Sequence, residues 1–165
     1  MTSQYDRYGD YIVDRRECLG SGTYGSVWRG FRLIRTREGD DVQLEPVAIK
    51  ESAYDQKNIQ EISTLQILTH PNIVRYIDYK ISKDSLFLVM ELCEGGTLED
   101  LLMEFNDEED LTDQVVFYYT QIVSGIKFMY EKNILHRDLK PSNILIKDHK
   151  IKIADFGTSK LKQEN

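Results

Sequence analysis

The sequence is poor in cysteine and has no long apolar run. Cys18 and Cys93 are the only cysteines among 165 residues, and they form no C-x-x-C pair. This excludes a disulfide framework or a zinc site as the organising feature and favours two thiols in a reducing compartment. No stretch approaches the roughly 18 apolar residues of a membrane span, and the amino terminus has no signal-peptide pattern. A soluble, cytoplasmic protein is therefore expected.

The sequence also lacks an excess of positive charge. Its 21 Lys and Arg residues face 28 Asp and Glu residues, which gives a formal net charge of −7. A nucleic-acid-binding protein normally presents a basic face, so that class is not expected, although a small nucleotide site remains possible. The hydrophobic fraction of 41% is enough to build a core for one domain or two small lobes.

The first half of the chain predicts strands and the second half predicts helices. The expected strands are 11–19, 26–34, 42–50, 73–81 and 85–92. The expected helices are 55–69 (capped by Asp55, with Ile59, Ile62, Leu65 and Leu68 at helical spacing), 97–105 (opened by Thr97) and 111–133 (long and largely buried). The acidic run 106–110 is expected to be a solvated loop, and 144–153 a tight hairpin. A cleft between two such lobes is a natural ligand site.

The stretch "LGSGTYGSVWRG" (19–30) contains glycines spaced as G-x-G-x-x-G. A dinucleotide fold would need a helix to begin inside this run, and "SVWRGFRL" is a poor helix opening and a good strand. A hairpin whose glycine tip covers phosphate groups is favoured, and a plain glycine turn is the alternative for the motif in isolation.

The segment "VAIK" (47–50) places Ala48 and Lys50 on the same side of a strand. A small alanine leaves room for a flat ring, and the ammonium of Lys50 can reach phosphate oxygens. Glu61 follows eleven residues later in the expected helix, where its carboxylate can pair with Lys50.

The strings "HRDLKPSN" (136–143) and "DFG" (155–157) carry the remaining chemistry. The carboxylate of Asp138 can accept a hydroxyl proton, and oxygen donors such as Asn143 and Asp155 suit Mg²⁺. His136 beside Asp138 also suggests His-Asp hydrolysis, but no Ser or Cys stands at a nucleophile elbow, which argues against that chemistry.

With these motifs in this order, the chain resembles a eukaryotic-type protein kinase catalytic domain of the Ser/Thr-specific branch. The resemblance covers about residues 11–160 and includes "HPNIV" (70–74). It implies an α+β, bilobal fold with a five-stranded antiparallel sheet and one helix in the small lobe. The implied division is a flexible tail (1–10), a small lobe (11–92), a hinge (93–96) and a partial large lobe (97–165).

The resemblance also implies Mg-ATP as the phosphate donor, a protein Ser or Thr hydroxyl as the acceptor, and a set of site residues. The implied catalytic residues are Asp138 as base, Lys140 beside the γ-phosphate, and Lys50 on the α- and β-phosphates with its partner Glu61. The implied nucleotide-binding residues are Leu19, Gly20, Gly22, Gly25, Val27, Ala48, Lys50, Met90, Glu91, Cys93 and Leu145. The implied Mg²⁺ ligands are Asn143 and Asp155.

The sequence departs from the family pattern in three respects. The separation between Lys50 and Glu61 is shorter than usual, and because the register from Glu61 through Leu65 to "HPNIV" is normal, the shortening falls in the loop and the first helical turn. The turn "KDHK" (147–150) is tight, which is expected to be harmless. The chain ends at Asn165, eight residues after Gly157 and before any A-P-E motif. A truncated large lobe is therefore expected, with weak autonomous activity and an exposed apolar surface that a protein partner covers. The alternatives to a kinase are a non-catalytic nucleotide-binding or scaffold module and a gene-model fragment.

Overall fold

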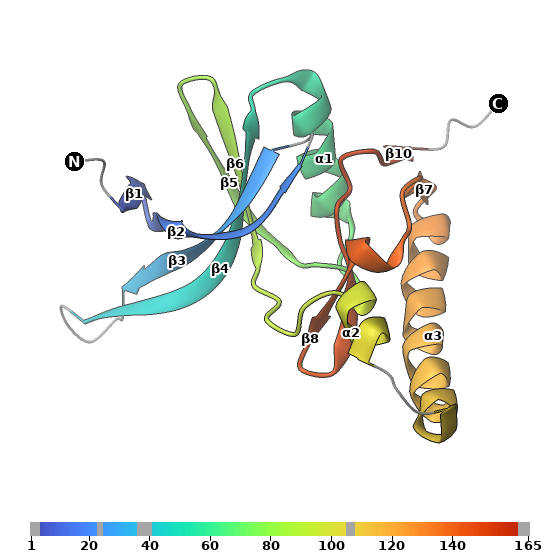
Figure 1. Cartoon of the computed structure of the whole chain (residues 1–165). Coiled ribbons are helices and arrows are strands. Elements are labelled where there is room, and N and C mark those ends of the chain that lie inside the picture. Colours follow the sequence, from blue (N-terminus) through green and yellow to red (C-terminus); the bar gives the residue numbers. More distant parts are fainter. Residues whose placement is uncertain (1–3, 23–24, 36–40, 105–107, 162–165) are drawn as a thin grey trace. The chain divides into compact units, whose positions relative to one another are not determined.

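A computed structural model describes residues 4–22, 25–35, 41–104 and 108–161 (Figure 1). The chain divides into two compact units. The first unit contains residues 1–62 and 76–92, and the second contains residues 63–75 and 93–165. None of the helices in the described part of the chain combines the length and the apolar character needed to span a membrane.

The first unit is built on a six-stranded antiparallel sheet. In pairing order, its strands are β1 (Tyr5–Tyr8), β2 (Tyr11–Gly22), β3 (Gly25–Arg35), β4 (Val42–Ala53), β6 (Ser85–Glu91) and β5 (Tyr76–Ser82). The five strands expected from the sequence are all present. In Figure 1 the long strands β3 and β4 run alongside each other as a curved ribbon.

Strand β1 is an addition to the expected sheet, and it lies where a flexible tail is predicted. Its residues pair with β2, with Tyr5 opposite Asp14 and Tyr8 opposite Tyr11. The ring of Tyr8 stacks on Phe87 with 4.1 Å between the ring centroids. The short, charged sequence "YDRY" does not predict a strand. The strand is stabilised by side-chain contacts with residues far away in the chain, such as that of Tyr8 with Phe87.

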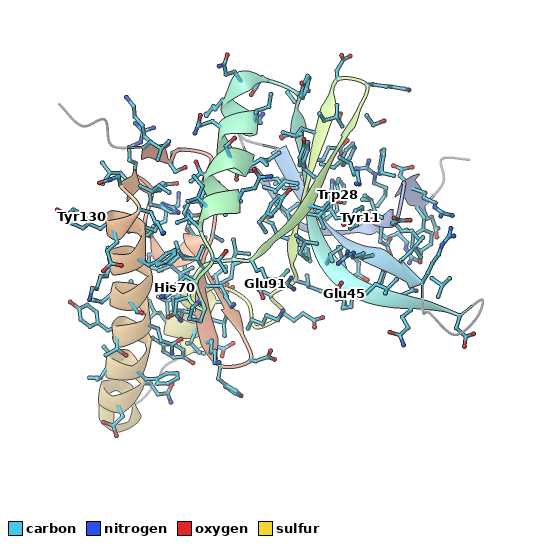
Figure 2. The ribbon with its side chains drawn as sticks, turned by 180° about the vertical axis from the view of Figure 1, so that it is seen from behind. Tyr11, Trp28, Glu45, His70, Glu91 and Tyr130 are labelled. Carbon is cyan, nitrogen blue, oxygen red and sulfur yellow. The ribbon has the colours of Figure 1, made fainter. Side chains whose placement is uncertain are left out.

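Alternation along the strands gives the sheet a closely packed face. The buried members of this cluster are Tyr11, Val13, Val47, Ile49, Phe87 and Val89. Trp28 packs against them, and Figure 2 shows its side chain beside that of Tyr11 on the sheet. Burial of each large apolar side chain contributes about 1.5–3 kcal/mol, so this cluster is a main source of stability for the first unit.

Helix α1 (Gln56–Ile67) follows β4 after two residues. Its buried residues are Asn58, Glu61, Ile62, Thr64 and Leu65, and Leu68 beyond its end is buried as well. The prediction that Ile59 belongs to this face is wrong, because its side chain is 38% exposed. Three polar residues, Asn58, Glu61 and Thr64, are buried on the face where an apolar stripe was expected.

The second unit contains two further helices, several short strands and one 3-10 turn. In chain order they are α2 (Leu98–Glu104), α3 (Glu108–Glu131), β7 (Ile134–Leu135), η1 (Pro141–Asn143), β8 (Ile144–Lys147), β9 (Lys150–Ile153) and β10 (Lys160–Leu161). The hydroxyl oxygen of Thr97 accepts the Asp100 N–H at 3.0 Å, and a carboxylate oxygen of Asp100 accepts the Thr97 N–H at 2.9 Å. This reciprocal cap confirms the prediction that Thr97 opens a helix.

Helix α3 begins earlier than predicted. Residues 108–110 are helical, whereas 106–110 is predicted to be a loop, and residues 106–107 lie outside the described residues. Acidic residues are favourable in a first helical turn because they face the positive end of the helix dipole, and this explains the difference.

The prediction that α3 is largely buried is wrong for its described side chains. Only Gly125 and Met129 are buried between residues 113 and 131. The exposed apolar side chains are Val115, Val116, Phe117, Tyr119, Val123, Ile126 and Tyr130. Figure 2 shows Tyr130 projecting outward from the helix, and this side chain is 66% exposed.

Candidate functional site

The glycine motif lies at the hairpin formed by β2 and β3. Gly22 is paired with Gly25 and Gly20 with Val27, and residues 23–24 between them lie outside the described residues. Gly25 has a φ of +115°, and a Cβ there would lie 2.1 Å from the carbonyl oxygen of Glu51. Because a strand and not a helix follows the glycines, the dinucleotide alternative is excluded and the predicted hairpin is present, while its role in covering phosphates stays a prediction.

Lys50 and Glu61 form a buried ion pair within the first unit. Both carboxylate oxygens of Glu61 lie 2.8 Å from Nζ of Lys50. The two residues are only 7% and 4% exposed. Removal of one partner from a buried pair costs about 3–5 kcal/mol because the other charge is left uncompensated. The predicted pairing is therefore present despite the short separation along the chain.

Several expected nucleotide-binding residues share one face of the sheet with Lys50. Val27 is opposite Lys50 between β3 and β4, and Met90 is opposite Ala48 between β4 and β6. Since residues directly opposite one another point to the same side, these four side chains belong to one face, and Gly20, which is paired with Val27, leaves that face open at its own position. The face is the one that the motif "VAIK" was expected to present.

The other expected nucleotide-binding residues are placed in different ways. Leu19 lies on β2 with its side chain 49% exposed. Glu91 ends β6 and its side chain is buried, which leaves its backbone as the contact that the resemblance implies (Figure 2). Cys93 and Leu145 belong to the second unit, where Leu145 forms an isolated bridge with Thr97.

In the second unit, two expected catalytic residues, Asp138 and Lys140, meet the expected Mg²⁺ ligand Asn143 in one loop. The side-chain nitrogen of Asn143 donates to Oδ2 of Asp138 at 3.0 Å and to the backbone oxygen of Asp138 at 2.9 Å. Nζ of Lys140 lies 3.3 Å from the same Oδ2. Asp138 is half-buried and Lys140 is exposed, so this group lies at the surface of its unit. The turn η1 is responsible for this approach, because it brings Asn143 back toward Asp138.

Asp155 is connected to this loop through its neighbours. The N–H of Ala154 donates to the backbone oxygen of Asn143 at 2.9 Å. Asp155 itself has a φ of +58°, and its Oδ1 accepts the N–H of Gly157 at 3.4 Å. An Asp in this conformation costs backbone energy, and such strain is concentrated at functional sites.

His136 organises the same loop from inside the unit. It is 3% exposed, and its Nε2 lies 2.8 Å from the carbonyl oxygen of Ala154. The carbonyl can only accept, so Nε2 carries the proton, and Nδ1 accepts the N–H of Asp138 at 3.3 Å. The ring also packs edge-to-face on Phe156 at 4.8 Å. Burial lowers the pKa of His136, which favours this neutral form.

Two further contacts join the "DFG" region to the "HRD" region. The hydroxyl of Thr158 donates to the backbone oxygen of His136 at 3.1 Å, and Nε of Arg137 donates to the backbone oxygen of Thr158 at 2.6 Å. Strands β7 and β10 pair immediately beyond them. These two-residue strands cannot be predicted from the sequence, because such short segments carry no periodicity.

A polar contact between α3 and β9 is also missed by sequence reasoning. Oε1 of Gln121 accepts from the side chain of Asn72 at 2.9 Å and from the N–H of Ile151 at 3.1 Å. Gly125, one turn later, leaves room for Ile153, whose Cδ1 would lie 2.8 Å from an added Cβ. The small residue in the middle of an aromatic-rich helix was the available signal for a close approach.

Comparison with known proteins assigns a family match to nearly the whole chain. The protein kinase domain family matches residues 13–165. The chain is 36% identical over 151 residues to the MAP kinase kinase kinase SSK2 of Saccharomyces cerevisiae, with 88% of this chain and 9% of that protein covered. It is 36% identical over 165 residues to the serine/threonine-protein kinase atg1 of Dictyostelium discoideum, with 93% and 24% covered.

A human relative gives a similar result. The chain is 34% identical over 160 residues to the mitogen-activated protein kinase kinase kinase 5 of Homo sapiens, with 95% of this chain and 11% of that protein covered. The chain thus spans less than a quarter of the length of each of these three relatives.

Proposed function

This chain belongs to the protein kinase family, and we propose that it binds Mg-ATP and transfers the γ-phosphate to a Ser or Thr hydroxyl of a protein. The observation that carries this proposal is the arrangement around Asp138. One carboxylate oxygen, Oδ2, is engaged by Asn143 and Lys140, which leaves Oδ1 for a substrate hydroxyl. This arrangement supports a role for Asp138 as a positioned general base.

In this proposal, Oδ1 of Asp138 accepts the proton as the hydroxyl oxygen forms its bond to the γ-phosphorus and ADP departs. The exposed ammonium of Lys140 stands beside the base and neutralises charge on the transferring group. Lys50, held by Glu61, orients the α- and β-phosphates. The glycine hairpin offers backbone N–H groups to the phosphates. The side chains of Val27, Ala48, Met90 and Leu145 offer apolar contacts to the adenine ring.

The residues proposed to hold Mg²⁺ are Asn143 and Asp155, and their chemistry fits this ion. The described residues contain no cluster of three or more His, Cys, Asp or Glu side chains suited to a metal. Mg²⁺ is typically held by one or two protein oxygens with water and phosphate completing its shell, so two ligands are sufficient. Because the nitrogen of Asn143 faces Asp138, its amide oxygen is directed to the other side of the group. When bound, Mg²⁺ would neutralise charge on the phosphate oxygens.

The test is phosphate transfer from γ-labelled ATP to a generic protein substrate such as casein, with wild type compared with Asp138→Asn. The variant keeps the shape of the side chain and loses the base, so its rate should fall by about 10²–10⁴-fold. Equal rates in the two proteins would exclude the proposed role of Asp138.

The exposed apolar side chains of α3 favour a second candidate, a nucleotide-binding module that works with a protein partner. Exposed apolar patches on soluble proteins usually mark a surface that another molecule covers. A thermal shift with Mg-ATP but no phosphate transfer in either protein would support this second function over the first. At 100 times the dissociation constant, bound nucleotide stabilises a protein by about 2.7 kcal/mol, which is readily detected.

A further inference from the structure

The connection between β4, which carries Lys50, and α1, which carries Glu61, is short. Only Tyr54 and Asp55 separate the end of β4 at Ala53 from the start of α1 at Gln56. Lys50 lies near the end of β4, and Glu61 lies in the second turn of α1. A tilt of the beginning of α1 would therefore displace Glu61 from Lys50 directly.

Asp55 caps the helix at this joint. Its Oδ1 accepts the backbone N–H of Asn58 at 2.8 Å, and its carbonyl oxygen accepts the N–H of Ile59 at 3.0 Å. These are the two bonds of an N-cap residue, and they place Asn58 at the third helical position. The third position often carries a Glu or Gln that reaches back to the N-cap.

Asn58 makes a different bond. Its side-chain nitrogen donates to the backbone oxygen of Ala53 at 2.9 Å, which ties the first helical turn to the last residue of β4. Asn58 is 7% exposed, while its neighbours Lys57 and Ile59 are exposed. It precedes Glu61 by three residues, so the two side chains lie on the same face of the helix.

We propose that Asn58 is a positioning residue that holds α1 at the angle at which both oxygens of Glu61 reach Lys50. Two contacts of 2.8 Å from one carboxylate to one nitrogen tolerate little rotation of the helix. The bond from Asn58 to Ala53 restrains this rotation because it joins the helix to the strand that carries Lys50. The inference rests on the proposed function, in which Lys50 orients the α- and β-phosphates of ATP.

The experiment measures how readily Lys50 of the full 165-residue chain is acylated by a water-soluble amine-reactive ester, with the site read by mass spectrometry. Asn58→Ala should raise the labelling rate of Lys50 about fivefold, the change that corresponds to one net hydrogen bond. Asn58→Asp, which keeps the shape but replaces the donor with an acceptor, should raise it at least as much. If neither folded variant changes the rate, the inference is wrong.

Asn72→Ala is the matched control. Asn72 is also a buried asparagine whose amide donates to a backbone oxygen, that of Ile151 at 3.3 Å, but it belongs to the second unit. It should destabilise the chain and leave the labelling of Lys50 unchanged. An equal increase in labelling for the Asn72 variant would mean that general loosening, and not the bond to Ala53, is responsible.

A double-mutant comparison separates a positioning role from a purely structural one. In a Glu61→Gln background, Asn58→Ala should add little to the labelling rate, because the group that it positions has lost its charge. The same fivefold increase in both backgrounds would contradict the inference. Labelling needs no nucleotide, so an absence of phosphate transfer would count against the proposed function and leave this result standing.

Discussion

Two independent constraints require a glycine at position 25. Its φ of +115° is strained for any residue with a side chain, and an added Cβ would lie 2.1 Å from the backbone oxygen of Glu51. The adjacent strand therefore fixes the position of the glycine hairpin relative to Lys50, which Glu51 follows in the chain.

We expect Gly25→Ala to lower the free energy of unfolding by about 1–3 kcal/mol, measured by urea denaturation, because the backbone must leave this conformation. Gly20→Ala is the control, since its Cβ would meet nothing within 4 Å and its φ is ordinary. That variant should change stability by no more than about 1 kcal/mol. Equal losses in the two variants would contradict the assignment.

A second prediction concerns the pH dependence that His136 gives to stability. Burial lowers the pKa of His136 in the folded state, so below the unfolded value of about 6.5 the unfolded chain binds more protons than the folded one. Stability should therefore fall as pH decreases from about 6.5 toward the folded pKa, by at most about 1.4 kcal/mol per pH unit.

The measurement is urea denaturation between pH 5 and pH 8 for wild type and His136→Gln. The variant should lose this part of the acid sensitivity. The pKa of His70 is lowered by burial as well, and its effect is common to both proteins, so the difference between them isolates His136. Parallel pH curves would show that His136 is not the group responsible.

Single residues could be identified from the sequence where they belong to a known motif, and not where only a contact in the folded chain marks them. Lys50, Asp138 and Asp155 belong to short motifs, and these motifs identified them as site residues. Asn58 stands in the unremarkable string "DQKN", and only its bond to Ala53 identifies it. Gln121 was missed for the same reason.

At the scale of elements, β1 shows how a strand depends on side chains outside its own segment. Nε of Arg15 lies 2.6 Å from Asp6, and its guanidinium also contacts Glu51 of β4 and lies over the ring of Trp28 at 5.1 Å. Arg15 lies in the irregular part of the β2–β3 pairing between Val13 and Cys18. One side chain therefore connects β1 to the strand that carries Lys50.

We expect Arg15→Ala to release β1 while the rest of the sheet remains folded. The backbone N–H groups of residues 5–8 should exchange with solvent about tenfold faster, which corresponds to about 1.4 kcal/mol and fits the loss of a charge-assisted hydrogen bond. Arg29→Ala is the control, because its ion pair with Glu17 is longer, at 3.7 Å, and more exposed. Unchanged exchange in β1 would exclude an anchoring role for Arg15.

The elements with clear periodicity were predicted well and those set by context were not. The five main strands and α2 were found from apolar alternation and a helix cap. The turn of the 144–153 hairpin was also expected to be tight, and Asp148 and His149 have φ values of 48° and 60°, typical of such turns. Strands β7 and β10 were missed because they pair with each other across a long stretch of chain. Strand β1 pairs with the residues that follow it, and it was missed because the side chains that anchor it, Tyr8 and Arg15, contact residues far away in the chain.

At the scale of the molecule, the sequence led to two opposed predictions for α3, a largely buried helix and an exposed apolar surface, and the second of them describes its side chains. Val116, Tyr119, Val123, Ile126 and Tyr130 follow one another at steps of three or four residues and are all exposed. Hydrophobicity alone predicted burial for them, because a sequence pattern identifies an apolar stripe without identifying what packs on it.

We expect this stripe to bind an environment-sensitive dye such as ANS in the folded chain. The double variant Val116→Lys/Val123→Lys should reduce the fluorescence enhancement at least twofold with little change in stability, because both side chains are solvated already. The double variant Asp113→Lys/Lys127→Arg, which makes the same total change in charge at exposed polar residues, serves as the control. Equal dye binding in all proteins would mean that the dye reports on another surface.

Trp28 is the single tryptophan of the sequence, and it packs against the apolar cluster of the first unit. Its emission therefore reports on that unit alone, whereas the far-ultraviolet dichroism of the chain is weighted toward α3 in the second unit. A single denaturation series recorded with both signals would resolve whether the two units melt together, without any label or engineered chromophore.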